Sequence, residues 1–326
     1  MITRRTTLAG LATTLATPFV AHRASAQAAF PDRPIKVLVP FGPGGLADIT
    51  VRVVAEKMGA LLGQQMVIVN QPGAGGIAAA KAVMSAPADG YTLALFTNGT
   101  AISVPLVNDL GFDPVKQFAP VSSLGFFDFL ILTGADSGYK TLADVLAAAK
   151  TKSGGLNIAT INIGSTQNLT AELFKAGVGA AMTIVPYKTS PDALTAAIRK
   201  DVDIVIDGYA AARAMLQDKR VIALATTGGQ RSTLWPDVPT VQESGLAGFD
   251  VTSWNALFTL AGTPQPVVAK LNEAVNAALK DETVIKKLFD LGIVARGGAP
   301  ADIGDRLKSD IAKWGAVIEK AGIARQ

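Results

Sequence analysis

Glycine and aspartate residues that could bind an anion follow a short apolar run near residue 40. After Val37 to Pro40 come Phe41, Gly42, Pro43, Gly44 and Gly45, and Asp48 stands three residues later. Glycine lets the backbone approach a ligand closely, and the unpaired N–H groups of a helix that starts here favour a carboxylate or a phosphate. The segment therefore predicts an anion-binding turn, with a structural strand-to-helix turn that binds nothing as the alternative.

A second polar helix start occurs in the other half of the sequence. Its residues are Gly164, Ser165, Thr166, Gln167 and Asn168, which precede or open a predicted amphipathic helix. The hydroxyl of Ser165 or Thr166 can cap that helix, and a plain cap needs no ligand. A carboxylate bound between two lobes requires two such helix starts, one in each half, because each lobe then offers N–H donors and hydroxyls.

Polar side chains also follow two of the predicted strands. Thr97 and Asn98 come at the end of one apolar strand, and Asp207 ends another. Ligand-facing residues lie at the carboxyl ends of strands in open α/β sheets, so we expect these side chains near the site. An ordinary turn after Thr97 and a helix cap at Asp207 are the alternatives. Lys188 could lie near the anion or remain solvated.

These residues need a scaffold of alternating strands and helices. The predicted strands are Ile35 to Pro40, Met66 to Asn70, Thr92 to Thr97, Leu130 to Thr133, Leu156 to Thr160, Ile184 to Pro186, Val202 to Asp207 and Val221 to Thr226. The predicted helices include Leu46 to Leu62, Leu142 to Ala149, Pro266 to Lys280, Glu282 to Leu291 and Ala301 to Ala321. Continuous apolar runs indicate parallel strands covered on both faces, hence an α/β fold with open, mostly parallel sheets flanked by helices.

The first 26 residues (1–26) are predicted to be an export signal. Arg4 and Arg5 precede a mildly apolar run, and Ala24 to Ala26 form a small-residue cleavage site. The twin-arginine and general secretory routes both remain open. The apolar run is too short to anchor the chain, and no later run reaches roughly 18 apolar residues, so we expect no direct membrane insertion.

The composition beyond this segment excludes several kinds of chemistry. Three of the 30 Lys and Arg residues lie in the segment, which leaves 27 basic against 26 acidic residues and no electrostatic basis for a nucleic-acid partner. The only histidine, His22, also lies there, and the chain has no cysteine. A Ser-His-Asp triad, a cysteine nucleophile and the usual zinc sites are thereby excluded. We expect no catalytic residue, no metal and no cofactor.

Ordered motifs along the whole chain resemble one known family, the substrate-binding proteins of tripartite tricarboxylate transporters, also called Bug proteins. The resemblance runs from about Phe30 to the C-terminus. The motifs are Val39 to Gly45 with Asp48, Pro72 to Gly76, Asp89 to Leu93, Val185 to Lys188, Pro236 to Gly245 and Gly262 to Pro264.

The resemblance implies a periplasmic, monomeric receptor with the two-lobed type II (Venus-flytrap) architecture of periplasmic binding proteins. It would close on a small carboxylate and deliver it to membrane transporter subunits. The resemblance also implies that the loops Phe41 to Asp48 and Gly164 to Asn168 grip the carboxylate, partly through ordered water. One lobe would comprise residues 27–124 plus 255–326, and the other residues 125–254.

Three positions depart from the family pattern. Asn168-Leu169 stands where His-Leu is usual, Thr189 replaces a common glycine, and Arg199-Lys200-Asp201 replaces a Gly-Gly-Gln segment. The side-chain contacts near Asn168 are therefore open, and no member's ligand is transferred to this chain.

Two other functions fit the same two-lobed shape. One is a sensor module that reports ligand occupancy to a signalling partner, and the other is an enzyme, which the lack of histidine and cysteine disfavours. As a further hypothesis, Asp48 and Asp207 could select a ligand that carries an ammonium or hydroxyl group besides its carboxylate.

Overall fold

The computed structural model describes residues 30–326 except 73–75, 107–109, 162, 164, 321 and 326. The predicted export signal and Gly164 lie outside the described residues. Among the described helices, none combines the length and apolar character that crossing a membrane requires.

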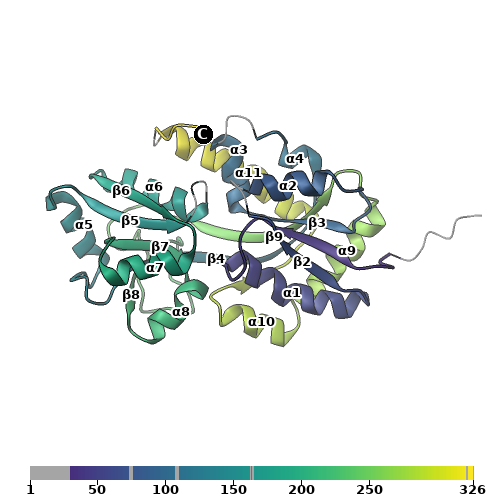
Figure 1. Ribbon diagram of the computed structural model, residues 1–326, viewed down its shortest axis with the longest axis horizontal. Coiled ribbons are helices and arrows are strands. Elements are labelled where there is room, and N and C mark those ends of the chain that lie inside the picture. Colours follow the sequence, from purple (N-terminus) through teal and green to yellow (C-terminus); the bar gives the residue numbers. More distant parts are fainter. Residues whose placement is uncertain are drawn as a thin grey trace, which may run out of the picture.

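Two groups of strands and helices lie side by side and are joined by two long strands (Figure 1). The first lobe contains β1 (Ile35–Val39), β2 (Met66–Asn70), β3 (Thr92–Thr97), α1 (Leu46–Leu62), α2 (Ile77–Met84), α3 (Asn98–Leu106) and α4 (Pro114–Gln117). The second lobe contains β5 (Leu156–Ile161), β6 (Met182–Tyr187), β7 (Ile204–Gly208), β8 (Val221–Thr226), α5 (Leu142–Thr151), α6 (Thr166–Val178), α7 (Ser190–Arg199) and α8 (Tyr209–Gln217).

The joining strands are β4 (Phe118–Gly134) and β9 (Thr252–Leu260), which run antiparallel to each other. β4 pairs with β9 as far as Asp128, and from Phe129 onward it pairs with β7 and β8. One strand therefore belongs to the sheets of both lobes. The predicted lobe boundaries fall inside β4 and β9, and they stay a prediction.

The C-terminal elements return to the first lobe. They are α9 (Gln265–Ala278), α10 (Glu282–Phe289), the short strand β10 (Val294–Ala295) and α11 (Pro300–Lys320). α9 and α10 pack on α1, α11 packs on α3, and β10 pairs with β4. The predicted C-terminal helices are thus confirmed within one or two residues at each end.

The α/β architecture is confirmed, and the sheet is mixed. β1 pairs with β2 and β3, and β5 with β6 and β7, all in parallel as predicted. The strands β4, β8, β9 and β10 pair antiparallel. This difference arises because β4 and β9 carry the chain across between the lobes in opposite directions.

α1 shows how the sequence forms an element that positions the site. Its buried residues Val51, Val54, Met58 and Leu62 recur every three or four positions, so one face packs against the sheet. The helix ends at Gly63, whose φ of 67° is the left-handed conformation that glycine adopts without strain. Its first turn directly follows the glycine turn at the carboxyl end of β1.

Candidate functional site

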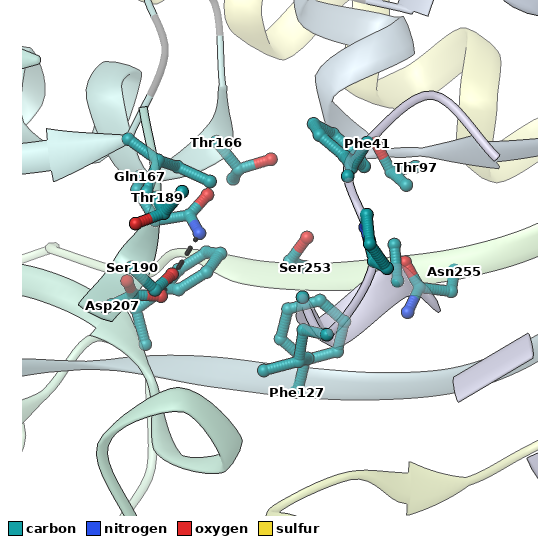
Figure 2. Close-up of a pocket in the computed structure, with 18 of the residues that line it drawn as sticks. Phe41, Thr97, Phe127, Thr166, Gln167, Thr189, Ser190, Asp207, Ser253 and Asn255 are labelled. Carbon is teal, nitrogen blue, oxygen red and sulfur yellow. Dashed lines mark hydrogen bonds between the residues drawn. The ribbon is translucent and has the colours of Figure 1, made fainter. Parts of the chain in front are cut away.

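A cavity of about 130 Å³ lies between the two lobes, where the strand ends and helix starts of both meet (Figure 2). Its first-lobe lining is Phe41, Gly42, Pro43, Gly44, Gly45, Leu46, Ala47 and Thr97. Its second-lobe lining is Ile161, Thr166, Gln167, Lys188, Thr189, Ser190, Pro191 and Asp207. The joining strands add Phe127, Phe129, Ser253 and Asn255.

The glycine turn presents the start of α1 to this cavity. Gly45 is the N-cap residue, and no side chain caps the helix, so the N–H groups of Leu46 and Ala47 have no side-chain acceptor there. Gly44 has a φ of 82°, a conformation that favours glycine. Backbone donors at an uncapped helix start favour an anion, which is the chemistry that the sequence predicted for this turn.

Asp48 stabilises the glycine turn through hydrogen bonds and does not line the cavity. Its carboxylate accepts hydrogen bonds from the Gly44 N–H (2.9 Å), Asn70 Nδ2 (2.8 Å) and Arg52 Nε (3.0 Å). Asn70 Nδ2 also donates to the Phe41 carbonyl at 2.9 Å. Burial acts to raise the pKa of Asp48, but Arg52, Gly44 and Asn70 outweigh it and the pKa is lowered. The carboxylate oxygens of Asp48 accept from protein donors and the residue does not line the cavity, so the structure does not favour the hypothesis that Asp48 selects the ligand.

The start of α6 brings Thr166 and Gln167 to the cavity. Ser165 is the N-cap residue: its hydroxyl accepts from the Asn168 N–H (3.1 Å) and donates to the Ile161 carbonyl (3.0 Å). Asn168 is buried, and its Nδ2 donates to Thr160 Oγ1 at 3.4 Å. Ser165 and Asn168 were expected to contact the ligand, but they shape the helix start instead.

The start of α7 is a further helix terminus at the cavity, which the sequence analysis did not identify as a site. Thr189 is its N-cap, with the hydroxyl accepting from the Asp192 N–H at 3.3 Å. Ser190 and Pro191 form the first helical positions and line the cavity together with Lys188. The sequence Thr-Ser-Pro-Asp does contain the signal of a helix start. It has a hydroxyl residue that can cap the helix, an acid three residues later, and a proline in the first turn.

Asp207 lies at the carboxyl end of β7, at the cavity wall, with 2% of its surface exposed. Its Oδ1 accepts from the Gly208 N–H (2.7 Å) and from Gln167 Nε2 (3.3 Å). Among the described residues, none forms a hydrogen bond with the buried Oδ2. Burial raises the pKa of Asp207, although the Ser190 hydroxyl, Gly208 N–H and Gln167 amide act to lower it.

The joining strands supply the wall between the lobes. Phe127 and Phe129 of β4 pack edge to face with centroids 5.6 Å apart, and they give the cavity an apolar side. Asn255 of β9 donates from Nδ2 to Thr50 Oγ1 at 2.9 Å, while its buried Oδ1 has no partner among the described residues. Ser253, Asn255 and Phe129 were missed because β9 and the first part of β4 were not recognised as strands.

The last residue of β3 and the residue that follows it face in different directions at the cavity. Thr97 lines it, and its Oγ1 accepts from the Gly99 N–H at 3.1 Å. Asn98 faces the other way: its buried Oδ1 accepts from Trp314 Nε1 of α11 at 2.9 Å. α3 begins directly at Asn98, so a helix stands where an ordinary turn was the alternative.

The chemistry of the lining suits an anion and offers no metal site. Helix starts from both lobes (α1, α6 and α7) reach the cavity with their positive ends, and Lys188 is the one basic side chain in the lining. Within the described part of the chain, no cluster of three or more His, Cys, Asp or Glu residues could hold a metal ion.

Comparisons with known proteins point to one family. The family model described as "Tripartite tricarboxylate transporter family receptor" matches residues 50–323. A UPF0065 protein of a Pseudomonas species is 35% identical over 318 residues, which cover 97% of this chain and 94% of that protein. The structure of MatC from Rhodopseudomonas palustris with bound malate has 34% identity and a TM-score of 0.82, and it covers 89% of this chain and 100% of that one. A second R. palustris structure, with adipate, has 33% identity and a TM-score of 0.86 over 90% and 99% of the two chains.

Proposed function

The chain belongs to the tripartite tricarboxylate transporter receptor family, and from this premise we propose that it captures a small carboxylate between its lobes and delivers it to a transporter of that type. The family resemblance predicted from the sequence is thereby confirmed, and so is the two-lobed fold, which the structures of relatives share. Because the family consists of receptors, we propose no enzymatic activity.

The convergence of helix starts from both lobes on one cavity is the observation that carries this proposal. The uncapped first turn of α1 offers backbone donors from the first lobe, and Thr166 and Ser190 offer hydroxyls from the second. A carboxylate can accept hydrogen bonds from both sides at once. Malate and adipate, which the two R. palustris structures contain, are both dicarboxylates.

Closure of the lobes would couple binding to delivery. A ligand held by α1 on one side and by α6 and α7 on the other gains its second set of contacts only when the lobes approach, so it favours the closed form. β4 and β9 are the segments that must bend, because they are the strands that join the lobes. The transporter would then recognise the closed form.

The ligand-binding set that we propose differs from the sequence expectation. It keeps Phe41, Gly42, Pro43, Gly44, Gly45, Thr97, Thr166, Gln167 and Asp207, and adds Leu46, Ala47, Lys188, Ser190, Ser253 and Asn255. Four further expected residues hold the surrounding backbone and helices in place by hydrogen bonds and do not belong to the set: Asp48, Asn98, Ser165 and Asn168. A periplasmic location, a monomeric state and membrane transporter subunits as partners remain part of the proposal.

The test is to measure the binding of mono-, di- and tricarboxylates to the purified protein by thermal shift and isothermal titration calorimetry. A ligand that binds only the folded state stabilises it by about 2.7 kcal/mol at a hundredfold excess over Kd. In the cavity variant Lys188→Gln we expect Kd to rise several-fold for every carboxylate, because a nearby positive charge is lost. Lys270→Gln, which removes an equal charge from an exposed position of α9, is the matched control. No stabilisation by any carboxylate would refute the proposal.

A further inference from the structure

Asp207 poses an electrostatic problem for a cavity that receives a carboxylate. Its side chain is buried at the cavity wall, between the starts of α6, α7 and α8. Figure 2 shows Asp207 and Ser190 next to each other, with the Gln167 amide above them. A charged Asp207 and a charged ligand in one enclosed space would repel each other strongly, because the dielectric there is low.

The groups around Asp207 do not neutralise a negative charge. α6 presents the neutral Gln167 and Thr166, β4 presents the apolar Phe129 and Leu130, and α1 places Leu46 against Gly208. Tyr209, directly after Gly208, packs its ring on Trp235 and does not line the cavity. Lys188, before α7, is the basic side chain among the described lining residues. No described charged residue forms an ion pair or hydrogen bond with the Asp207 carboxyl.

The two oxygens of this carboxyl have different surroundings. Oδ1 accepts two hydrogen bonds, from the Gly208 N–H and Gln167 Nε2, so it is the oxygen that stays unprotonated. Oδ2 is buried without a hydrogen bond from any described residue, so it is the oxygen that can carry a proton. The Ser190 hydroxyl lies close to the carboxyl, although not in hydrogen-bonding geometry with Oδ2, and it also lines the cavity.

We propose that Asp207 is held as a neutral carboxylic acid, and that in the ligand-bound protein its Oδ2–H donates to Ser190 while the Ser190 hydroxyl donates to the ligand carboxylate. This inference rests on the proposed function, because it assumes an anionic ligand. A charged Asp207 would instead accept the Ser190 hydrogen and turn the lone pairs of Ser190 toward the ligand. The protonation of Asp207 thus sets the direction in which Ser190 donates, and Asp207 acts as a positioning residue.

The pH dependence follows with a definite sign. Burial raises the pKa of Asp207, and an anionic ligand favours the neutral form further. Affinity is therefore full below the pKa of Asp207 in the ligand-free protein and falls as the pH rises through it, by up to tenfold per pH unit.

The test compares Asp207→Asn with Asp207→Ala, using succinate, malate and adipate as probes in calorimetry from pH 5.5 to 8.5. Asparagine keeps an acceptor for Gly208 and Gln167 and places an N–H donor at the Oδ2 position, so we expect Kd within about threefold of wild type and no fall with pH. Alanine should weaken binding at least tenfold. Asp218→Asn, an exposed residue after α8, controls for the change in net charge. If asparagine weakens binding as much as alanine, Asp207 serves as a charged acceptor for a ligand ammonium or hydroxyl, and the inference is overturned.

Infrared spectroscopy of the ligand-free protein separates this inference from the proposed function. A neutral Asp207 gives a carboxylic-acid carbonyl band at pH 6 that Asp207→Asn removes and Asp218→Asn retains. If the band is absent while carboxylates bind, the inference fails and the proposed function stands. If the band is present and no carboxylate binds, the proposed function fails, and the role of Ser190 toward a ligand fails with it.

Discussion

Replacing Asp48 by alanine should weaken the binding of every ligand by a common factor, because Asp48 orders the glycine turn and does not contact the ligand. The substitution removes the carboxylate acceptor of the Gly44 N–H and of Asn70 Nδ2, and it leaves Arg52 without its ion-pair partner, although Arg52 still donates to Asn70 Oδ1. Arg52 is about half exposed, so the estimate counts only the hydrogen bonds that Gly44 and Asn70 donate to the Asp48 carboxylate. At about 1.5 kcal/mol or more for each bond to a charged group, the free energy of unfolding falls by about 3 kcal/mol.

The assay has a stability arm and a binding arm. A loss of that size lowers Tm by about 4–6 °C in a folded chain of roughly 300 residues, measured by calorimetry. Because the pKa of Asp48 is lowered in the folded protein, the stabilisation is present above the unfolded-state pKa and disappears as the pH falls through the folded-state pKa. The difference in Tm from wild type should therefore shrink in acid. Asp305→Ala, an exposed acid on α11, is the control.

The binding arm uses succinate, malate and aspartate, which share one carbon skeleton and differ by a hydroxyl or an ammonium group. Ordering a freed residue costs about 1–2 kcal/mol, so a mobile turn raises Kd by about 5- to 30-fold, equally for each of the three that binds. The reasoning is refuted if Asp48→Ala leaves Tm unchanged, or if only malate and aspartate lose affinity.

Two further substitutions test the segment that joins the lobes. Asp128 is the last β4 residue paired with β9, and burial, with Asp250 nearby and opposed by Thr252, raises its pKa to about 6. A raised acid pKa destabilises the folded state progressively as the pH rises from the unfolded-state pKa to about 6, and fully above it. Asp128→Asn should therefore raise the free energy of unfolding by about 1–2 kcal/mol at pH 7.5 and leave it nearly unchanged at pH 4, in urea titrations. Gly125→Ala should lower stability by about 1–3 kcal/mol, because the added Cβ would lie 2.6 Å from Ile293 Cγ2 and 3.2 Å from the Val294 carbonyl oxygen. In the control Gly138→Ala the added Cβ meets no atom within 4 Å, so at a φ of 93° that substitution reports backbone strain alone. Equal losses of stability at the two sites would contradict the packing argument.

Local sequence patterns predicted the elements that carry the site, and long-range geometry decided which side chains reach it. The runs Met66–Asn70, Thr92–Thr97 and Val221–Thr226 are apolar except for asparagine or threonine at their ends, and their strands have the predicted bounds. β9 escaped prediction because Ser253 and Asn255, which face the cavity and its surroundings, interrupt its apolar character. Polar residues that allow a strand to contact a ligand therefore also interrupt the apolar pattern from which a strand is predicted.

The predicted site residues divide on the same principle. Glycine-turn residues reach the cavity because a strand end and a helix start fix the backbone locally. The positions of Asp48 and Asn98 depended on partners 22 and 216 residues away, Asn70 and Trp314, which no local pattern reveals. The cap at Ser165 was foreseen as an alternative, and it is the role that the structure gives this residue.

Because β4 is one continuous strand, this receptor cannot readily be divided into separately folded lobes. Cutting the chain at a lobe boundary would sever a strand of 17 residues and leave each fragment with an unsatisfied sheet edge, which is prone to aggregate. Neither half should therefore be produced alone, and reporter proteins for a biosensor belong in surface turns such as that at Gly262, where the backbone leaves the sheet and an added Cβ meets no neighbour.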